Sequence, residues 1–496
     1  MEQPTKQTFS QRLQTTTRKQ WIKAGIWCVL YLLFVIWLGN FWWLLVLPFI
    51  FDAFVTRYIP WNWWKNSKNK TLRSVMSWVD AIVFALVAVY LINNYLFQNY
   101  QIPTSSLEKT LLVGDFLAVS KAAYGPRVPM TPLSFPLVQN TFPIINTNSY
   151  FEKPQVKYRR LKGHTHIKRD DIVVFNFPAG DTIAFKVQNP DYYSICYYEG
   201  LSHVVNVLNQ EPNTDLIYKY GREIVSENRA MYGEIMYRPV DRRENYVKRC
   251  VGLPGDTLQV VNNQVVVNGT PQQKHPGIQF NYFIQTDGTR LTKTLIDDLK
   301  ISNEDYEELN TAGNSNLIQQ IGLNPNYPVY HFPLTAETYN QLANTHGVTK
   351  LVIEPDWMTT SPVGDSMYPL GGNTGWTRDN YGPIFIPKKG ATIKLDSVTY
   401  RVYERCIRNY EGNKLEIRNG HYFINNQSVD SYTFQMDYYW MMGDNRHKSA
   451  DSRSWGFVPE DHVVGRPMFV WLSLNKDKSL FGGKIRFDRF FKNAKR

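Results

Sequence analysis

Three short segments combine hydroxyl, amine and carboxylate side chains, the groups that can perform nucleophilic chemistry. They are Gln101–Asp115 (QIPTSSLEKTLLVGD), Tyr246–Asp256 (YVKRCVGLPGD) and Gly443–Pro459 (GDNRHKSADSRSWGFVP). A serine needs a base before it can attack an amide, and the nine histidines are scattered, with no apparent Ser/His/Asp set. A lysine can act as that base if burial lowers its pKa by several units from about 10.4. The second segment supplies such an amine in Lys248.

Together these segments resemble bacterial signal peptidase I, the membrane-bound serine endopeptidase that removes signal peptides from exported proteins. The third segment is similar to the family's G-D-N-R-x-x-S-x-D-S-R-x-W-G motif at every fixed position, and the second to K-R-x-x-G-x-P-G-D. Residues 169–178 look like the family's R-G-D-x-V-x-F box, with Asp170 in place of the glycine. The resemblance leaves most of 275–430 unexplained.

The resemblance assigns a role to each matching residue. Ser106 is implied as the nucleophile and Lys248 as the general base. The supporting residues that it implies are Thr104 at the oxyanion, Ser449, Asp451 and Arg453. The first box departs from the family's P-S-x-S-M-x-P-T-L, because it reads PTSSLEKTL from Pro103. Leucine replaces methionine, a volume-conserving exchange, and Lys109 replaces a proline.

The residue types suit these roles on physical grounds. Lys248 lies in a strand-like run in which alternate residues share a face, so we expect it to point inward with Tyr246 and Cys250. Arg249 is then expected to point outward. The Ser449 hydroxyl can orient the lysine amine.

The carboxylate and guanidinium that follow Ser449 have a separate expected role. We expect Asp451 and Arg453 to form an ion pair that supports their loop. The backbone N–H of Ser106, together with the Thr104 hydroxyl, is expected to stabilise the oxyanion, and one such donor is worth about 3–4 kcal/mol in other serine enzymes.

Other interpretations compete with this one. Ser106-Leu-Glu-Lys109 is also an S-x-x-K tetrad, the nucleophile signature of penicillin-binding acyl-transferases, but the sequence has no K-T-G. Ser105 offers a second hydroxyl, which in an extended strand would point to the opposite face. Ser366, in GDSMYPL, fits S-M-x-P but follows the lysine segment. A catalytically degenerate membrane adaptor is the alternative that is not an enzyme.

The segments that must position these residues read mainly as β. Runs such as 171–177, 257–269 and 391–396 are rich in β-branched residues and bounded by turn formers. The segment 258–269 predicts a hairpin around Asn262-Asn263, whereas 294–322 looks helical or irregular. We therefore expect a mainly β catalytic domain of the signal peptidase kind, with a large insertion and an N-terminal α-helical membrane anchor.

Apolar runs at 24–38, 41–55 and 78–97 predict the anchor. The stretches before the first run and between the second and third are basic, so the positive-inside rule places both in the cytoplasm. The expected organisation is a cytoplasmic N-terminus at 1–23, a membrane hairpin or re-entrant segment at 24–55, a cytoplasmic loop at 56–77, a transmembrane helix at 78–97, an external catalytic domain at 98–475 with an insertion at about 275–430, and a basic tail at 476–496. One long span through 24–55 is the alternative.

Composition sets limits on the class of protein. With 43% hydrophobic and 20% charged residues, the chain is not wholly disordered. The net charge of +12 arises from basic residues that flank apolar runs, which indicates membrane topology and not nucleic-acid binding. Four cysteines form no disulfide framework, and neither a metal nor an organic cofactor is implied. By the resemblance, the partners are exported preproteins, the lipid bilayer and the export machinery, and the location is a bacterial cytoplasmic membrane with the catalytic domain on its outer face.

Overall fold

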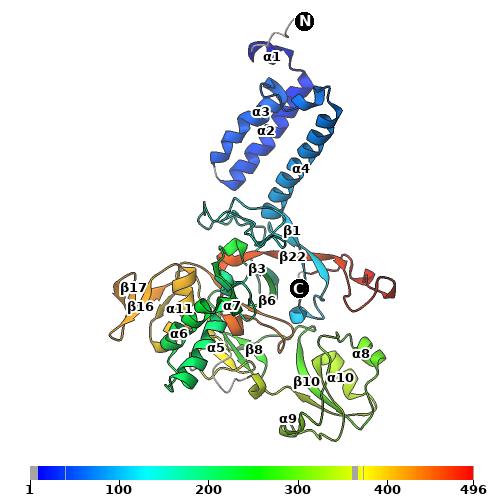
Figure 1. The fold of residues 1–496 in the computed structure, drawn as a ribbon, viewed down its shortest axis with the longest axis vertical. Coiled ribbons are helices and arrows are strands. Elements are labelled where there is room, and N and C mark those ends of the chain that lie inside the picture. The colour runs from blue at the N-terminus through cyan, green and yellow to red at the C-terminus, as the bar shows by residue number, and fades with distance from the viewer. Residues whose placement is uncertain (1–8, 40, 360–366, 373, 495–496) are drawn as a thin grey trace. The chain divides into compact units, whose positions relative to one another are not determined.

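The computed structural model describes residues 9–39, 41–359, 367–372 and 374–494 (Figure 1). The chain divides into two compact units, Met1–Ile92 and Asn93–Arg496.

The described part of the first unit is helical. Its elements are α1 (Phe9–Thr15), α2 (Arg18–Leu38), η1 (Phe41–Val46), α3 (Leu47–Phe51), the π-helical turn η2 (Asp52–Thr56), η3 (Trp63–Asn66) and most of α4 (Lys70–Tyr95). Helix α2 is followed by Gly39, whose φ of 60° suits a glycine directly after a helix. The chain then returns, and α3 and η2 contact α2.

Two of these helices, α2 and α4, are long and apolar enough to cross a membrane by length and composition. Residues 43–56 form a shorter apolar helix. Helix α4 starts at Lys70, earlier than the apolar run at 78–97, because the Asn69 side chain accepts bonds from the N–H groups of Thr71 and Leu72 and caps the helix.

The second unit is built on a seven-stranded sheet of order β1-β2-β22-β3-β6-β20-β21, in which each strand pairs antiparallel with its neighbour. Its strands are β1 (Phe97–Gln101), β2 (Asp115–Ser120), β22 (Val463–Ser473), β3 (Ile172–Asn176), β6 (Asn245–Gly252), β20 (Tyr438–Met442) and β21 (Val458–Pro459). Strands far apart in sequence are therefore neighbours, and apolar clusters that share β3 cover both of its faces.

Smaller sheets surround this one. One sheet has the order β11 (Glu307–Glu308), β12 (Val329–Thr335), β10 (Gln279–Thr286), β13 (Val348–Ile353), and another has the order β14 (Tyr381–Phe385), β7 (Thr257–Val261), β8 (Gln264–Val267), β9 (Thr270–Pro271). A third sheet consists of β16 (Leu415–Arg418), β17 (His421–Ile424) and β18 (Gln427–Val429). Two further sheets are strand pairs, β15 (Thr392–Lys394) with β19 (Ser431–Thr433) and β4 (Thr182–Ala184) with β5 (Ile235–Tyr237). The expected hairpin is confirmed, with Asn262 and Asn263 at φ of 47° and 67° between β7 and β8.

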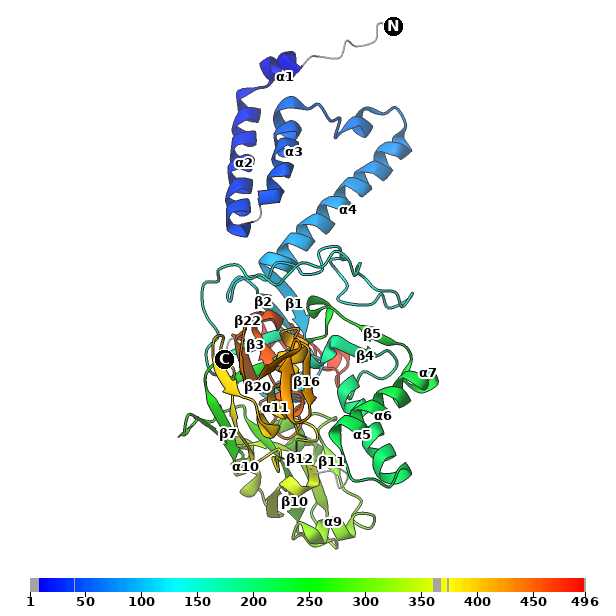
Figure 2. The ribbon, with the colours of Figure 1, turned by 90° about the vertical axis from the view of Figure 1, so that its left-hand side faces the viewer.

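Helices occupy the connections between strands. They are α5 (Tyr192–Ser202), α6 (Thr214–Glu227), α7 (Arg229–Tyr232), α8 (Lys293–Asp298), α9 (Ser315–Gln320), α10 (Ala336–Ala343), α11 (Ser397–Arg405) and α12 (Ser452–Trp455). Within this unit, β10 and α10 lie at the end away from β1 in both Figure 1 and Figure 2. The expected fold class, mainly β with apolar N-terminal helices, is confirmed.

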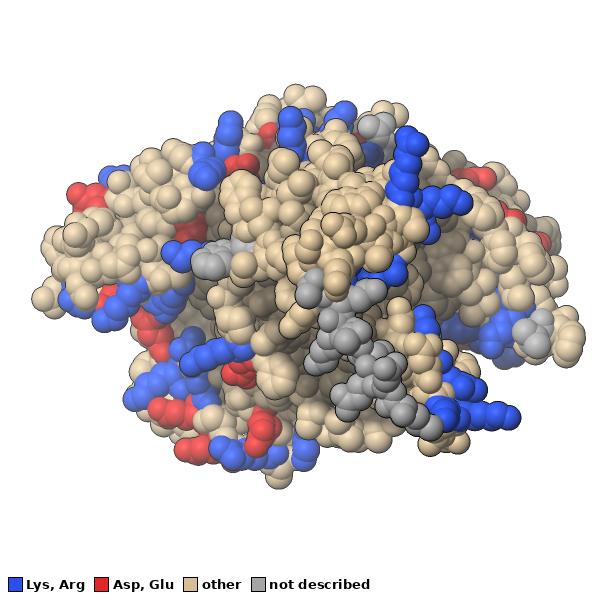
Figure 3. All heavy atoms as spheres, turned by 90° about the horizontal axis from the view of Figure 1, so that it is seen from above, with Lys and Arg blue, Asp and Glu red and all other residues tan. Residues whose placement is uncertain are grey.

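Charge is distributed unevenly over the surface. On the face shown in Figure 3, the Lys and Arg side chains of the described residues lie in scattered groups among acidic and uncharged residues. They form no continuous stripe on that face.

Candidate active site

The serine turn lies directly after β1. Residues Ser105–Leu107 form a single 3-10 turn, η4, and Ser106 is only 7% exposed. The loop that follows β20 fixes the backbone of this turn, because Asn445 N donates to Ser106 O at 3.1 Å and Asn445 Nδ2 donates to Ser105 O at 3.5 Å. The serine turn and the loop after β20 are therefore bonded together directly.

Lys248 reaches the serine hydroxyl from the central sheet. Lys248 belongs to β6, which lies between β3 and β20 in the sheet. The Nζ atom of Lys248 lies 2.6 Å from Ser106 Oγ. Burial lowers the pKa of Lys248 to about 8, although the charges of Asp451 and Asp444 oppose the shift. The amine can therefore become neutral, and accept a proton, about two pH units below an exposed lysine.

The two faces of β6 are both covered. As expected, Lys248 shares a face with Tyr246, whose ring centre lies 5.6 Å from Nζ, and with the buried Cys250. The expectation that Arg249 points outward is wrong, because this side chain is 1% exposed. A strand with neighbours on both sides and apolar layers around it has no solvent face at this position.

Arg249 is neutralised by a carboxylate from the loop after β20. Its Nε and Nη2 donate to the two oxygens of Asp444, each at 2.7 Å. Thr110, just beyond the serine turn, donates to the same carboxylate at 2.7 Å. Burial alone would raise the pKa of Asp444, but the bonds and charge of Arg249 outweigh it and hold that pKa below its usual value. The sequence motifs gave no sign of this pairing, because the partners are 195 residues apart.

Asp451 and Arg453 form the expected ion pair, with Nη2 and Oδ2 2.8 Å apart and both side chains buried. Asp451 also accepts a hydrogen bond from the N–H of Gly443 at 3.1 Å. Its carboxylate therefore links the start of the loop after β20 to the residues that follow Ser449. Burial would raise the pKa of Asp451, but Arg453 and the backbone bonds hold it below its ordinary value.

Ser449 lies close to the serine turn without bonding to the lysine. A Cβ added to Gly443 would lie 2.2 Å from Ser449 Oγ and 2.6 Å from Ser106 O, so both atoms approach this glycine closely. The Ser449 hydroxyl is buried and has no hydrogen-bond partner among the described residues. The expected bond from Ser449 to the Lys248 amine is therefore not formed in this conformation.

Thr104 immediately precedes the serine turn. It is exposed and its backbone is extended, with φ −128° and ψ 158°. Its side chain makes no capping hydrogen bond to the N–H groups of the turn, and its oxyanion role stays a prediction.

The competing candidates point elsewhere. Lys109 Nζ donates to Leu299 O at 3.0 Å and to Lys300 O at 2.6 Å, while the amine that bonds Ser106 belongs to Lys248. Ser105 is in the 3-10 turn and not in an extended strand, yet its Oγ does point away, toward Asp305 Oδ1 at 3.3 Å. Ser366 lies outside the described residues.

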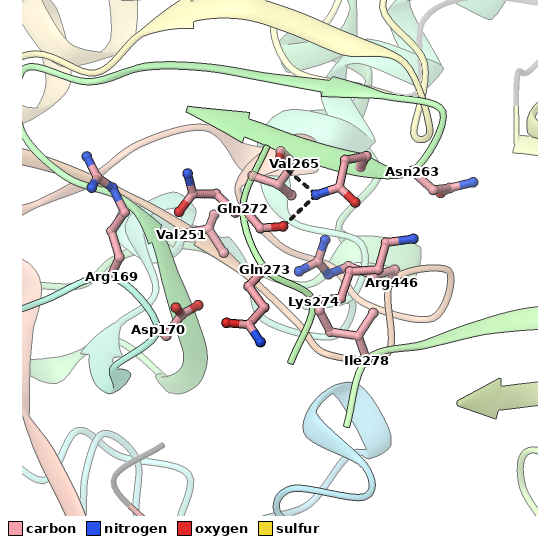
Figure 4. Close-up of a pocket in the computed structure, with 11 residues that line it drawn as sticks. Arg169, Asp170, Val251, Asn263, Val265, Gln272, Gln273, Lys274, Ile278 and Arg446 are labelled. Carbon is pink, nitrogen blue, oxygen red and sulfur yellow. Dashed lines mark hydrogen bonds between the residues drawn. The ribbon is translucent and has the colours of Figure 1, made fainter. Parts of the chain in front are cut away.

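A small cavity borders the loop after β20 (Figure 4). Arg446 of that loop lines it together with Arg169, Asp170 and Lys274, and its volume of about 20 Å³ is room for one water-sized molecule. Neither Ser106 nor Lys248 lines this cavity, so it is separate from the Ser–Lys pair.

Comparison with known proteins identifies the class and then the family. The family model described as signal peptidase, peptidase S26, matches residues 75–302 and 388–472. Signal peptidase I of Haemophilus influenzae is 24% identical over 436 residues, which cover 86% of this chain and 78% of that protein. Signal peptidase I of Buchnera aphidicola subsp. Baizongia pistaciae is 22% identical, with 87% of each chain covered. A thylakoidal processing peptidase of Arabidopsis thaliana is 36% identical over 72 residues.

The chain is thus a hydrolase of the serine endopeptidase class. It belongs to the signal peptidase family, peptidase S26, whose model matches well over half of its length. The family model leaves 303–387 unmatched, and this stretch lies inside the insertion expected at about 275–430.

Proposed function

We propose that the chain cleaves N-terminal signal peptides from exported preproteins, with Ser106 as the nucleophile and Lys248 as the general base. The observation that supports this most strongly is the 2.6 Å separation of Lys248 Nζ and Ser106 Oγ. The residues of the family's motifs, far apart in sequence, meet at this pair, and the buried amine has a lowered pKa.

The proposed reaction proceeds in two transfers. Neutral Lys248 takes the Ser106 proton while Oγ attacks the scissile carbonyl, and the Ser106 N–H and Thr104 hydroxyl stabilise the oxyanion. The ammonium then protonates the leaving amine, which gives an acyl-enzyme. Lys248 next removes a proton from water, which attacks the ester carbonyl. The bond between the acyl carbon and Ser106 Oγ then breaks, and the Lys248 ammonium returns the proton to Oγ.

The expected cleavage position follows from the family resemblance. The substrate binds as an added β-strand, and shallow pockets accept small residues at −1 and −3.

In this proposal the catalytic unit lies on the outer face of the cytoplasmic membrane, and the apolar helices anchor it there. Cleavage of a synthetic peptide with Ala at −1 and −3 distinguishes this enzyme from a degenerate adaptor, which would leave the peptide intact.

The experiment is a set of four alanine variants assayed on a preprotein. Ser106→Ala and Lys248→Ala should abolish cleavage, because each removes one partner of the Ser–Lys pair. Lys109→Ala should keep most of it, and Ser105→Ala should keep a measurable part, because their side chains bond to the insertion and not to the reacting groups. Loss in Lys109→Ala with a functional Lys248→Ala would favour the S-x-x-K mechanism of penicillin-binding enzymes.

A further inference from the structure

A carboxylate from the insertion contacts both the serine turn and the loop after β20. Asp305 follows α8, and its side chain is 2% exposed. Its Oδ1 accepts a hydrogen bond from Ser105 Oγ at 3.3 Å. The same oxygen forms an ion pair with Lys448, whose Nζ lies 2.6 Å away. One oxygen therefore bonds to the residue before Ser106 and to the residue before Ser449.

The insertion holds this carboxylate in a fixed orientation. Ser302 Oγ donates to Asp305 Oδ2 at 2.7 Å, and Asp305 N donates to Ser302 O at 3.0 Å. Lys448 Nζ also donates to the backbone oxygen of Glu304 at 2.8 Å. Because a local turn fixes both the carboxylate and the neighbouring carbonyl, the lysine meets a preformed acceptor pair.

We propose that Asp305 is a positioning residue for the Ser–Lys reaction, tying the serine turn to the loop that carries Ser449. This inference rests on the proposed roles of Ser106 and Lys248. Asp305 touches neither Lys248 nor the Ser106 hydroxyl in the contacts described, so it acts through Ser105 and Lys448.

The location of the contact determines what it changes. Nucleophilic attack needs the oxygen within a fraction of an ångström of its productive position, and a small displacement lowers the rate strongly. The acids whose charges raise the pKa of Lys248 are Asp451 and Asp444, and Asp305 is not among them. Loss of the Asp305 contacts should therefore lower kcat without changing the pH at which Lys248 titrates.

The test compares Asp305→Asn and Lys448→Met with a matched control, in the full chain. Asn keeps the shape of the side chain and an acceptor for Ser105 but removes the charge that meets Lys448. The control is Lys476→Met, because Lys476 pairs with Glu304, beside Asp305, yet comes from the C-terminal region after β22. Lys448→Arg serves as the conservative rescue variant.

We expect kcat to fall roughly tenfold or more in Asp305→Asn and Lys448→Met, with KM within about twofold and an unchanged pH midpoint. Lys448→Arg should recover most of kcat, and Lys476→Met should match the wild type. The double variant should lose no more than either single variant, because both remove the same tie.

Two results would overturn the inference. One is a wild-type kcat in Asp305→Asn at a lowered melting temperature, which would make the contact purely structural. The other is multiplied losses in the double variant, which would make the two residues independent. Either result leaves the Ser–Lys pair intact if Ser106→Ala is inactive in the same assay, so the two proposals fail separately.

Discussion

Arg249, the residue after the proposed base, carries a full charge inside the sheet. It is 1% exposed and pairs with Asp444, which is fully buried. Taking two ions out of water is costly, and the pair is stable only while both partners remain. The pair also offsets the Asp444 charge, one of the two that raise the pKa of Lys248.

Removal of Asp444 should therefore destabilise the catalytic unit. Asp444→Ala leaves a buried guanidinium without its carboxylate, and we expect a loss of about 3–5 kcal/mol in the free energy of unfolding. Denaturant unfolding of the purified chain, followed by the fluorescence of its tryptophans, measures the loss.

An ion pair with one exposed partner provides the control. Arg169 is 37% exposed and pairs with Asp256 at 2.6 Å, so Arg169→Met should cost less than about 1 kcal/mol. Equal losses in the two variants would contradict the account of a buried pair.

Sequence patterns predicted one face of β6 and missed the other. Alternation along the strand correctly grouped Lys248 with Tyr246 and Cys250. It gave no information on what covers the opposite face, because the neighbouring strands β3 and β20 come from distant parts of the chain. The contact of Asp305 with the serine turn spans 200 residues and was hidden for the same reason.

At the scale of elements, a single glycine lets the loop after β20 approach the serine turn. Gly443 directly follows β20, and its missing side chain leaves room for Ser449 Oγ and Ser106 O. An added methyl group would lie 2.6 Å from that backbone oxygen, which is closer than a Cβ atom comes to a non-bonded backbone atom, so the two elements must move apart.

Gly443→Ala should thus cost activity more than it costs folding. We expect kcat/KM to fall by about 10²-fold, since a shift of about 1 Å in the serine turn is enough for such a loss. Cleavage kinetics and circular dichroism of the same sample measure the two effects.

Gly313→Ala is the control for that change, because its nearest neighbour would be Asn310 Nδ2 at an ordinary 3.5 Å. It should leave the rate unchanged. A fully active Gly443→Ala would contradict this account, because it would show that the loop can move away from the serine turn without loss of rate.

Local signals predicted some elements well and others poorly. The Asn262-Asn263 pair fixed the β7–β8 hairpin, because both residues accept a positive φ. Ser105-Ser106 has no such signal, and the 3-10 turn there depends on bonds from Asn445, far along the chain. Element type could be read from short stretches, whereas the geometry of the site required the assembled sheet.

At the scale of the whole molecule, the N-terminal unit carries α2 and most of α4, the two described helices that are long and apolar enough to cross a membrane. Helix α2 has 21 residues, or about 30 Å at 1.5 Å per residue, which matches the hydrocarbon core of a bilayer. The run that returns from it is shorter. With basic segments at 6–23 and 56–73, we propose that both of these stretches are cytoplasmic and that α4 leads the chain outward.

Cysteine labelling in intact cells tests this topology. In a background without the four native cysteines, a cysteine at Gln101 should react with a membrane-impermeant thiol reagent from outside. One at Lys68 should react only after the membrane is opened, and one at Asn40 should be more accessible than Lys68. Weak reaction at Asn40 fits a re-entrant return arm, but reaction of Lys68 in intact cells would reverse the proposed orientation.

The pairing of Ser106 with Lys248 is tested most directly by the pH dependence of kcat/KM for the full chain, from about pH 5 to about pH 10. This quantity reports the essential base of the free enzyme, and burial lowers the pKa of Lys248 to about 8. Lysine is active as a base only when neutral, so kcat/KM should rise tenfold per pH unit below about pH 8 and level off above it. A midpoint near 6.5, lost on replacement of a histidine, would contradict the lysine base, as would activity that survives in Lys248→Ala.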